Sequence, residues 1–474
     1  MRDTNFFRTM SLVAIVGCWA GIGAQQGPMK QAVADGAGVV ADPSFSVSLK
    51  PVLLNRSIPF LQSCAWARSG DKILLIGGRT EGFHGTAQSD SLFSKSRANS
   101  SVWVLNLTDF TARSVPVDTK ETSMMQYLSS NMEFVQDGDM LFIAGGFGAR
   151  KPGDTHSNHT FARIAAIQVS AMIRAVETGS PISKAILYTA SSPFVQVTGG
   201  ELVKAGDTFY LMFGQKYDTT YQEQITGQYT SAIRKFRFKP GAVTDTSSII
   251  SPVLHRRDLT VAPIIQKNNL MYGAFGGVFT AEGDGYQNPV FITIGQTKPA
   301  VKPDTLKQIT NQYDCAFATI YDPISDTNIT VLMGGIGKFQ YCSKTDCWED
   351  GDGGQPLPFV KSITQMHFRK GRLSQHIQLP PLEAEMPGLI GAGAIFFPHR
   401  NLCSANRVID YTKLKGNSVS IGYLYGGIKS MFASTNLTPT TINKTVYEVF
   451  LHKTTNSRKD RVFRQCDTAC ESSR

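Results

Sequence analysis

The chain has 474 residues, of which 42% are hydrophobic and 18% are charged, and its formal net charge is +10 at pH 7. This composition is that of an ordinary globular protein and excludes a disordered or fibrous chain. Basic residues cluster in the tail at 453–474, but elsewhere they are spread among acidic ones, without an arginine-rich or aromatic nucleic-acid motif. We therefore expect no nucleic-acid partner and interpret the positive charge as a solvated surface.

The first 24 residues have the pattern of an export signal. Arg2 and Arg8 precede an apolar run at 10–20, and small residues lead to Ala24. A charged start and a short apolar stretch are typical of a secretory signal, because a membrane-spanning helix needs about 20 apolar residues. Cleavage after Ala24 predicts a secreted or periplasmic protein. The alternative is a lipoprotein signal over 1–17, because Ile-Val-Gly-Cys ending at Cys18 resembles a bacterial lipobox and lipid on Cys18 would anchor the protein to a membrane.

The first predicted strand lies within 42–54. Phe45, Val47 and Leu49 alternate with polar residues, and a short apolar run follows at 52–54. A period of two predicts a strand with one buried face.

From residue 58 onward, a hydrophobic strand that runs into small residues recurs six times. The copies end at Gly77-Gly78, Gly145-Gly146, Gly214-Gln215, Gly276-Gly277, Gly334-Gly335 and Gly426-Gly427. Their first glycines are 68, 69, 62, 58 and 92 residues apart, and the third copy lacks the second glycine. The longest interval contains loop-like insertions around 340–355 and 399–416. A strand-rich unit repeated at such spacing indicates a β-propeller.

Strand-like segments flank the glycine pairs. Segments 63–67 and 314–318 precede them, and segments 102–105, 233–238 and 447–451 follow them. Small residues on inner strands and aromatic or β-branched residues elsewhere fit tapering propeller blades of four strands each. The sequence therefore predicts an all-β, six-bladed β-propeller over 58–452. The strand at 42–54 is expected to pair with the last blade and close the ring.

A hydrophobic strand ending in Gly-Gly, followed by strands with aromatic residues, resembles the kelch-repeat family of β-propellers. Segments 197–202 and 255–258 also resemble exported kelch-type proteins of Bacteroidetes. The resemblance implies a kelch-like propeller. The family's spaced Tyr and Trp positions are only partly filled here, so no activity follows from it.

Seven of the eight cysteines lie outside the predicted signal. Cys342 and Cys347 are close in sequence, as are Cys466 and Cys470, and in an oxidising compartment each pair is expected to form a local disulfide. This spacing disfavours zinc. The acidic segment 349–353 is similar to calcium-binding loops and leaves a structural calcium open. Otherwise we expect no metal and no cofactor.

Candidate site residues lie beside the repeated strands. Arg256, Arg257 and Asp258 begin the fourth copy, where arginines could bind a carboxylate and the aspartate could transfer a proton. The alternative is that Arg257 and Asp258 form a structural ion pair. Other polar residues follow the glycine pairs, and their loops could meet at one mouth of the channel, where propellers commonly bind ligands. These ligand-binding candidates are Arg79, Glu81, His84, Lys216, Tyr217 and Lys338.

Three functions remain open. The first is an exported module that binds a carbohydrate or a protein, and it is favoured because the sequence has neither a nucleophile triad nor a complete metal site. The second is an enzyme acting on an acidic sugar, since sialic acid mutarotases are kelch propellers that transfer protons. The third is an accessory subunit of an envelope export or uptake complex. Copper radical oxidases, also kelch-type, are disfavoured because no adjacent Tyr-His pair matches their motif.

Overall fold

The computed structural model describes residues 44–82, 97–152, 158–218, 227–266, 269–295, 298–350, 357–404, 407–433, 440–454 and 464–466. All of them belong to one compact unit, Ala41–Arg474, and the other unit, Met1–Val40, lies outside the described residues. The described part is nearly all β-strand. No helix within it is long and apolar enough to cross a membrane.

Six antiparallel sheets, each with four principal strands, follow one another along the chain. Sheet 1 contains β2 (Ala65–Ser69), β3 (Lys72–Ile76), β4 (Ser101–Asn106) and β5 (Thr111–Pro116). Sheet 2 contains β6 (Ser130–Asp137), β7 (Met140–Ala149), β9 (Arg163–Gln168) and β10 (Ile186–Ser191), with β8 (Asn158–Thr160) beside β7. Sheet 3 contains β11 (Thr198–Ala205), β12 (Thr208–Lys216), β14 (Ala232–Lys239) and β15 (Ala242–Ile250), with β13 (Gln228–Tyr229) beside β12.

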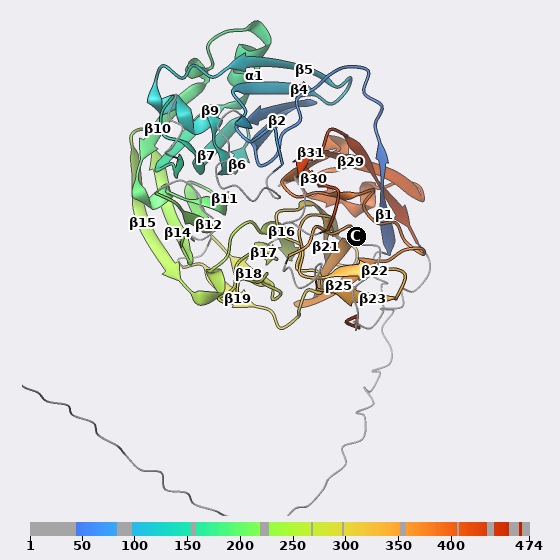
Figure 1. Ribbon diagram of the computed structural model, residues 1–474. Coiled ribbons are helices and arrows are strands. Elements are labelled where there is room, and N and C mark those ends of the chain that lie inside the picture. Colours follow the sequence, from blue (N-terminus) through green and yellow to red (C-terminus); the bar gives the residue numbers. More distant parts are fainter. Residues whose placement is uncertain are drawn as a thin grey trace, which may run out of the picture. The chain divides into compact units, whose positions relative to one another are not determined.

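The remaining three sheets repeat this order. Sheet 4 contains β16 (Thr260–Gln266), β17 (Asn269–Phe275), β18 (Val290–Thr293) and β19 (Ala300–Pro303). Sheet 5 contains β20 (Ala316–Asp322), β21 (Thr327–Met333), β24 (Ile363–Arg369) and β25 (Arg372–Gln378), with β28 (Ile409–Asp410) beside β20. Sheet 6 contains β27 (Ala394–Pro398), β29 (Ser418–Gly426), β32 (Tyr447–Lys453) and β1 (Phe45–Pro51). Figure 1 shows the sheets succeeding one another in sequence order, with β1 beside the last of them.

Short elements connect these sheets. Two small sheets pair β22 (Gln340–Cys342) with β23 (Cys347–Glu349), and β30 (Ile428–Ser430) with β26 (Leu389–Ile390) and β31 (Thr441–Ile442). The described 3₁₀ helices are η3 (Thr122–Leu128), η4 (Ile182–Ala185), η5 (Pro193–Val195), η6 (Pro252–Leu254), η8 (Arg400–Leu402) and η10 (Tyr411–Lys413).

One α-helix, α1 (Val169–Thr178), is described, and it is amphipathic. Its buried residues Val169, Met172, Ile173 and Val176 have the spacing of one helical face. They join the apolar layer between sheets 1 and 2. The helix ends at Gly179, whose φ of 69° is the left-handed conformation that glycine adopts at low cost.

The core consists of apolar layers between consecutive sheets. Along β7, Leu141 and Ile143 pack in the layer shared with sheet 1. Phe142 and Ala144 alternate with them and pack against sheet 3. Because successive strand residues point to opposite faces, one continuous hydrophobic run fills two layers.

The glycine pairs lie where each second strand meets the next sheet. The second glycine donates its N–H across the boundary, as Gly78 does to the Ser129 carbonyl at 2.8 Å and Gly335 to the Ile390 carbonyl at 3.0 Å. A Cβ on the preceding Gly334 would overlap that same Ile390 oxygen. The repeated glycines therefore allow two backbones to approach closely.

In the third copy the predicted alignment is wrong by one residue. Gly214 makes the bond of a second glycine, donating to the Arg256 carbonyl at 2.9 Å. Phe213, with a φ of 62°, occupies the first position. The missing glycine is therefore the first of the pair, and Gln215 lies beyond the motif.

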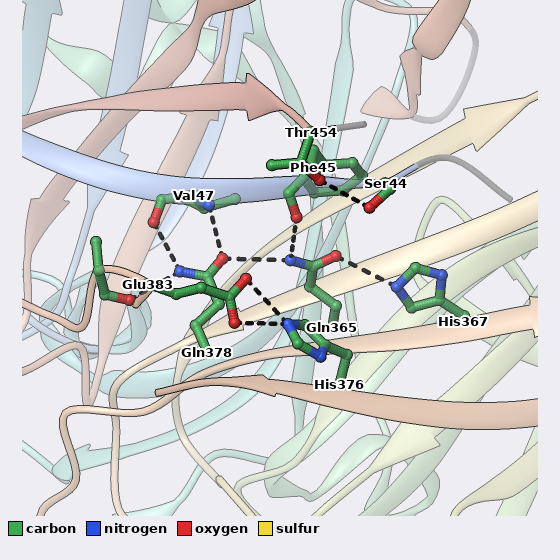
Figure 2. A network of polar contacts seen from close by, with 10 residues as sticks. Ser44, Phe45, Val47, Gln365, His367, His376, Gln378, Glu383 and Thr454 are labelled. Atoms are coloured by element: carbon green, nitrogen blue, oxygen red, sulfur yellow. Dashed lines mark hydrogen bonds and ion pairs between the residues drawn. The ribbon is translucent and has the colours of Figure 1, made fainter. Parts of the chain in front are cut away.

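The segment 42–54 contains β1, which pairs antiparallel with β32 from Phe45 opposite Lys453 to Pro51 opposite Tyr447. The other edge of β1 is bound by side chains of sheet 5 (Figure 2). Gln378 accepts from the Val47 N–H at 2.6 Å and donates to the Val47 carbonyl at 2.8 Å. Gln365 donates to the Phe45 carbonyl at 3.0 Å. Two glutamines thus occupy hydrogen-bonding groups that an edge strand would otherwise expose.

The predicted local disulfides are wrong. Cys347 is bonded to Cys466, with Cα atoms 5.2 Å apart. Cys342 is itself disulfide-bonded. The pairs Cys342 with Cys347 and Cys466 with Cys470 therefore cannot form, and Cys470 lies outside the described residues.

The reason for this pairing is that the C-terminal segment 464–466 runs alongside β23. The Trp348 N–H donates to the Arg464 carbonyl, and the Cys466 N–H donates to the Trp348 carbonyl, both at 2.8 Å. This pairing brings Cys466 to Cys347 across 119 residues of sequence. Nearness in sequence was therefore a poor guide to the partner.

Candidate functional site

Each sheet has one residue with a left-handed backbone at or just before its first strand, and we call these six the ring residues. They are Ser63, Asn131, Gly199, Asp258, Asp314 and Gly393, with φ between 49° and 71°. Backbone hydrogen bonds join them from sheet to sheet. Asn131 donates to Ser63 at 3.0 Å, Asp258 to Gly199 at 2.8 Å, Asp314 to Asp258 at 2.9 Å, Gly393 to Asp314 at 2.7 Å and Ser63 to Gly393 at 3.1 Å.

The remaining link of this ring is made by a side chain. The Thr198 hydroxyl, next to Gly199, donates to the Asn131 carbonyl at 3.1 Å. The chain of contacts therefore returns from sheet 6 to sheet 1. It links the starts of all six first strands through their backbones and the Thr198 side chain.

Two ring residues are aspartates, and Arg257 lies beside them. The Arg257 NH1 is 2.8 Å from the Asp258 carboxylate. Burial nevertheless raises the pKa of Asp258, and the charge of Arg257 only partly offsets it. Burial and the negative charge of Asp258 raise the pKa of Asp314 well above its ordinary range. The two carboxyl groups are thus a pair that favours holding a proton.

Two glutamates lie two residues beyond ring positions, Glu133 on β6 and Glu201 on β11. Glu133 accepts from the Gly200 N–H at 2.9 Å, yet burial and the charges of Glu201 and Asp258 raise its pKa well above its usual value. Burial raises the pKa of Glu201 to about 8, against the opposing effect of Arg407. Together with the two aspartates, we call these residues the carboxylate cluster.

Two aromatic side chains, Tyr229 and Phe279, contact Arg257, and His255 and Tyr286 adjoin them. The rings of Tyr229 and His255 stack with centroids 4.0 Å apart, and His255 Nδ1 is 2.9 Å from the Tyr286 hydroxyl. The Arg257 guanidinium lies 5.2 Å from the centre of the Phe279 ring, and its Nε donates to the Tyr229 hydroxyl at 3.3 Å. Gln215, with its amide oxygen toward the guanidinium, accepts from Arg257 Nε at 3.1 Å.

Arg257 and the four rings are half-buried, so part of each is accessible. We call these five residues the arginine–aromatic surface. It offers flat apolar faces next to charged hydrogen-bonding groups.

Arg256 points elsewhere and is only 2% exposed. It donates to the carbonyls of Val253 at 3.1 Å, Gly276 at 3.2 Å and Asn288 at 3.0 Å, and it lies over the Tyr286 ring. Burial lowers its pKa to about 10. The contacts of Arg256 hold the turn that carries Tyr286.

The other predicted binding residues follow the glycine pairs of sheets 1, 3 and 5. Arg79 is buried and forms an ion pair with Glu81. Lys216 lies 3.7 Å from Asp218, whereas Tyr217 is 6% exposed and packs on Phe147.

Lys338 forms an ion pair with Asp284 and so joins sheet 5 to the turn before Tyr286. Of the predicted set, Arg257, Asp258 and Lys338 therefore lie on or next to the arginine–aromatic surface. His84 lies outside the described residues.

Sequence reasoning missed Glu133, Glu201, Asp314 and Tyr229. The signal for the acids was positional, because aligning the copies on their first strands places Asp314 with Asp258 and Glu201 with Glu133. Tyr229 lies on the two-residue strand β13, for which the sequence has no clear pattern.

A separate surface cleft of about 520 Å³ lies between the β2–β3 turn and α1. It is lined by polar residues including Lys72 and Glu177, whose charged atoms are 2.5 Å apart. Because the β2–β3 turn is at the end of β2 remote from Ser63, this cleft is separate from the carboxylate cluster. Among the residues that the structure describes, no group of three or more His, Cys, Asp or Glu side chains could hold a metal ion.

No protein-family model matches the chain, and no curated protein matches it. The solved structure of YjhT is similar over 84% of this chain and 99% of that chain, with 10% sequence identity and a TM-score of 0.48. A similarity this weak assigns neither a family nor an activity.

Proposed function

We propose that this chain is an exported, six-bladed kelch-like β-propeller that binds a carbohydrate at the end of its channel where the ring residues lie. The six four-stranded sheets, the glycine pairs between them and the links among the ring residues support the propeller. In this proposal β1 completes the last blade and closes the ring, as the pairing with β32 would allow. Export rests on the N-terminal signal pattern.

The observation that carries the ligand class is the arginine–aromatic surface beside the carboxylate cluster. Sugars present apolar C–H faces that pack on aromatic rings, and hydroxyl groups that bond to arginine and carboxylate side chains. The half-buried rings of Tyr229 and His255 lie next to Arg257 and therefore offer both kinds of contact.

A carbohydrate is favoured over a protein partner or an envelope complex. A docking platform is expected to expose a broad apolar patch. The described large hydrophobic residues that are exposed do not belong to the arginine–aromatic surface: Leu53, Leu187, Ile250, Ile324, Leu382 and Met431. Polar recognition at one site fits this surface better.

A glycan-array screen of the mature protein tests the proposal. Selective binding should be lost in Arg257→Ala, which removes the cation between the Asp258 carboxylate and the Phe279 ring. The control is Arg237→Ala, an exposed arginine 3.6 Å from Asp245. Equal binding by both variants and the wild type, or no binding to any glycan, would contradict the proposal.

The carboxylate cluster supports a second function, an enzyme that moves a proton on an acidic sugar. Carboxyl groups with raised pKa values next to an arginine suit acid–base chemistry at neutral pH. Here Arg257 would bind the sugar carboxylate, while Asp314 or Glu201 would exchange the proton. NMR spectra that follow the interconversion of sugar anomers test this function. The wild-type protein should accelerate the interconversion, and Asp314→Asn should not. If the wild-type protein does not accelerate it, the enzyme function is wrong and binding remains the proposed function.

A further inference from the structure

The described parts of the segment between β27 and β29, residues 399–404 and 407–416, lie at the end of the first strands remote from the ring residues. Within it, β28 pairs in parallel with the last part of β20, with Ile409 opposite Ile320. Val408 and Ile409 are fully buried and anchor the segment. A connecting loop thus contributes a strand to the edge of a first strand.

Arg407 extends from this segment to two other first strands. Its guanidinium carbon lies 3.7 Å from the centre of the Trp66 ring on β2. Its NH2 donates to Gln136 on β6 at 3.2 Å. Gln136 in turn accepts from the Arg68 N–H and donates to the Arg68 carbonyl, both at 2.8 Å. Arg407 therefore contacts β2 at Trp66 and β6 at Gln136, three and five residues beyond the ring residues Ser63 and Asn131.

The charge of Arg407 acts on the carboxylate cluster through Glu201 on β11. Burial lowers the pKa of Arg407 to about 10, and the charge of Arg68 lowers it further. The charges of Glu201 and Cys403 oppose this shift. In return, Arg407 limits the rise in the pKa of Glu201. The other groups coupled to Glu201 are Glu133 and Tyr272, and its negative charge raises the pKa of both.

We propose that Arg407 closes the remote end of the space between the first strands, so that a ligand reaches the carboxylate cluster only from the end where Arg257 lies. The inference rests on the proposed function for the identity of that binding end. It adds that the channel is a dead-end pocket, with a fixed cation behind its acids. Its test uses no ligand, so a failure to bind glycans would not decide it.

The first measurement is the pKa of Glu201, obtained by a pH titration of the carboxyl ¹³C NMR signals of glutamate-labelled protein. The Glu201 signal is identified by its absence in Glu201→Gln. Arg407→Met should raise this pKa by about one unit, because an opposite charge nearby favours the ionised form. Arg407→Lys keeps the charge and should leave the pKa near the wild-type value. Arg400→Met, in the same loop but exposed, is the control and should change nothing. An unchanged pKa in Arg407→Met would contradict the placement of a fixed cation behind the acids.

The second measurement is quenching of tryptophan fluorescence by acrylamide, with the Trp66 contribution obtained by subtracting the Trp66→Phe variant. Trp66 is 8% exposed, and the stacked guanidinium covers its ring. Arg407→Met should make Trp66 more quenchable, whereas Arg400→Met should not. If Trp66 is equally protected in Arg407→Met, the closure is wrong. Arg407→Lys, which preserves a long cationic side chain, provides the comparison if the methionine variant does not fold.

Discussion

Replacing Gln378 by alanine tests how β1 is held in the fold. Gln378 is 1% exposed and Val47 is fully buried. The substitution removes the acceptor of the Val47 N–H at 2.6 Å and the donors to the Val47 and Ala384 carbonyls, both at 2.8 Å. Leaving the two buried Val47 groups without partners costs about 1–3 kcal/mol each, so the free energy of unfolding should fall by about 2–6 kcal/mol. That is a large part of the roughly 5–15 kcal/mol of a typical domain.

Urea unfolding followed by circular dichroism measures this loss, and Gln375→Ala is the matched control. Gln375, also on β25, accepts from the Ile309 N–H at 3.1 Å and donates to the Lys307 carbonyl at 2.9 Å. Its bond to Lys307 is exposed and its bond to Ile309 is only part-buried, so water can replace Gln375 at both groups and the substitution should cost about 1 kcal/mol. If Gln378→Ala were no more destabilising than Gln375→Ala, the glutamine contacts would not hold β1 as described.

Three further changes test other parts of the fold. Deleting 42–54 removes β1 from the last sheet and should lower the melting temperature sharply, whereas an unchanged melting curve would defeat ring closure. In urea unfolding, Gly334→Ala should destabilise the protein by roughly 3 kcal/mol or more, because its Cβ would overlap the Ile390 oxygen. Gly371→Ala is the control, and it should cost about 1–2 kcal/mol because Gly371 also has a positive φ but lies in open space. The folded-state pKa of Glu201 is raised from 4.5 to about 8, so its contribution to stability is fully present below pH 4.5 and is lost as the pH rises through 8. Unfolding midpoints of Glu201→Gln should therefore decline less across that window than those of the wild type, in which the other raised carboxyl groups also titrate.

Much of the fold could be predicted because close backbone contacts leave a mark in the sequence. Where two sheets meet, a side chain at Gly334 or Gly426 would overlap a backbone oxygen, so glycine pairs recur in five of the six sheets. The predicted alignment of the third copy was wrong because Phe213 there adopts the conformation that glycine has in the other copies. The disulfide prediction was wrong because the pairing of 464–466 with β23 is a tertiary contact between segments remote in sequence.

The candidate site was predictable only in part. The charged run at 256–258 was conspicuous, but the sequence does not show that Arg256 turns toward backbone carbonyls while Arg257 faces Tyr229. Glu133 and Glu201 are ordinary residues in strand patterns, and they become unusual only because the fold buries them together. Their raised pKa values are therefore properties of the assembled sheets.

A crystal structure of the mature protein with the glycan that binds most strongly in the array would show where the carbohydrate lies. We expect electron density for the sugar against Arg257 and the Tyr229 ring, at the end of the first strands where Asp258 and Asp314 lie. Density in the cleft beside α1, or on another face with Arg257 unoccupied, would contradict this placement.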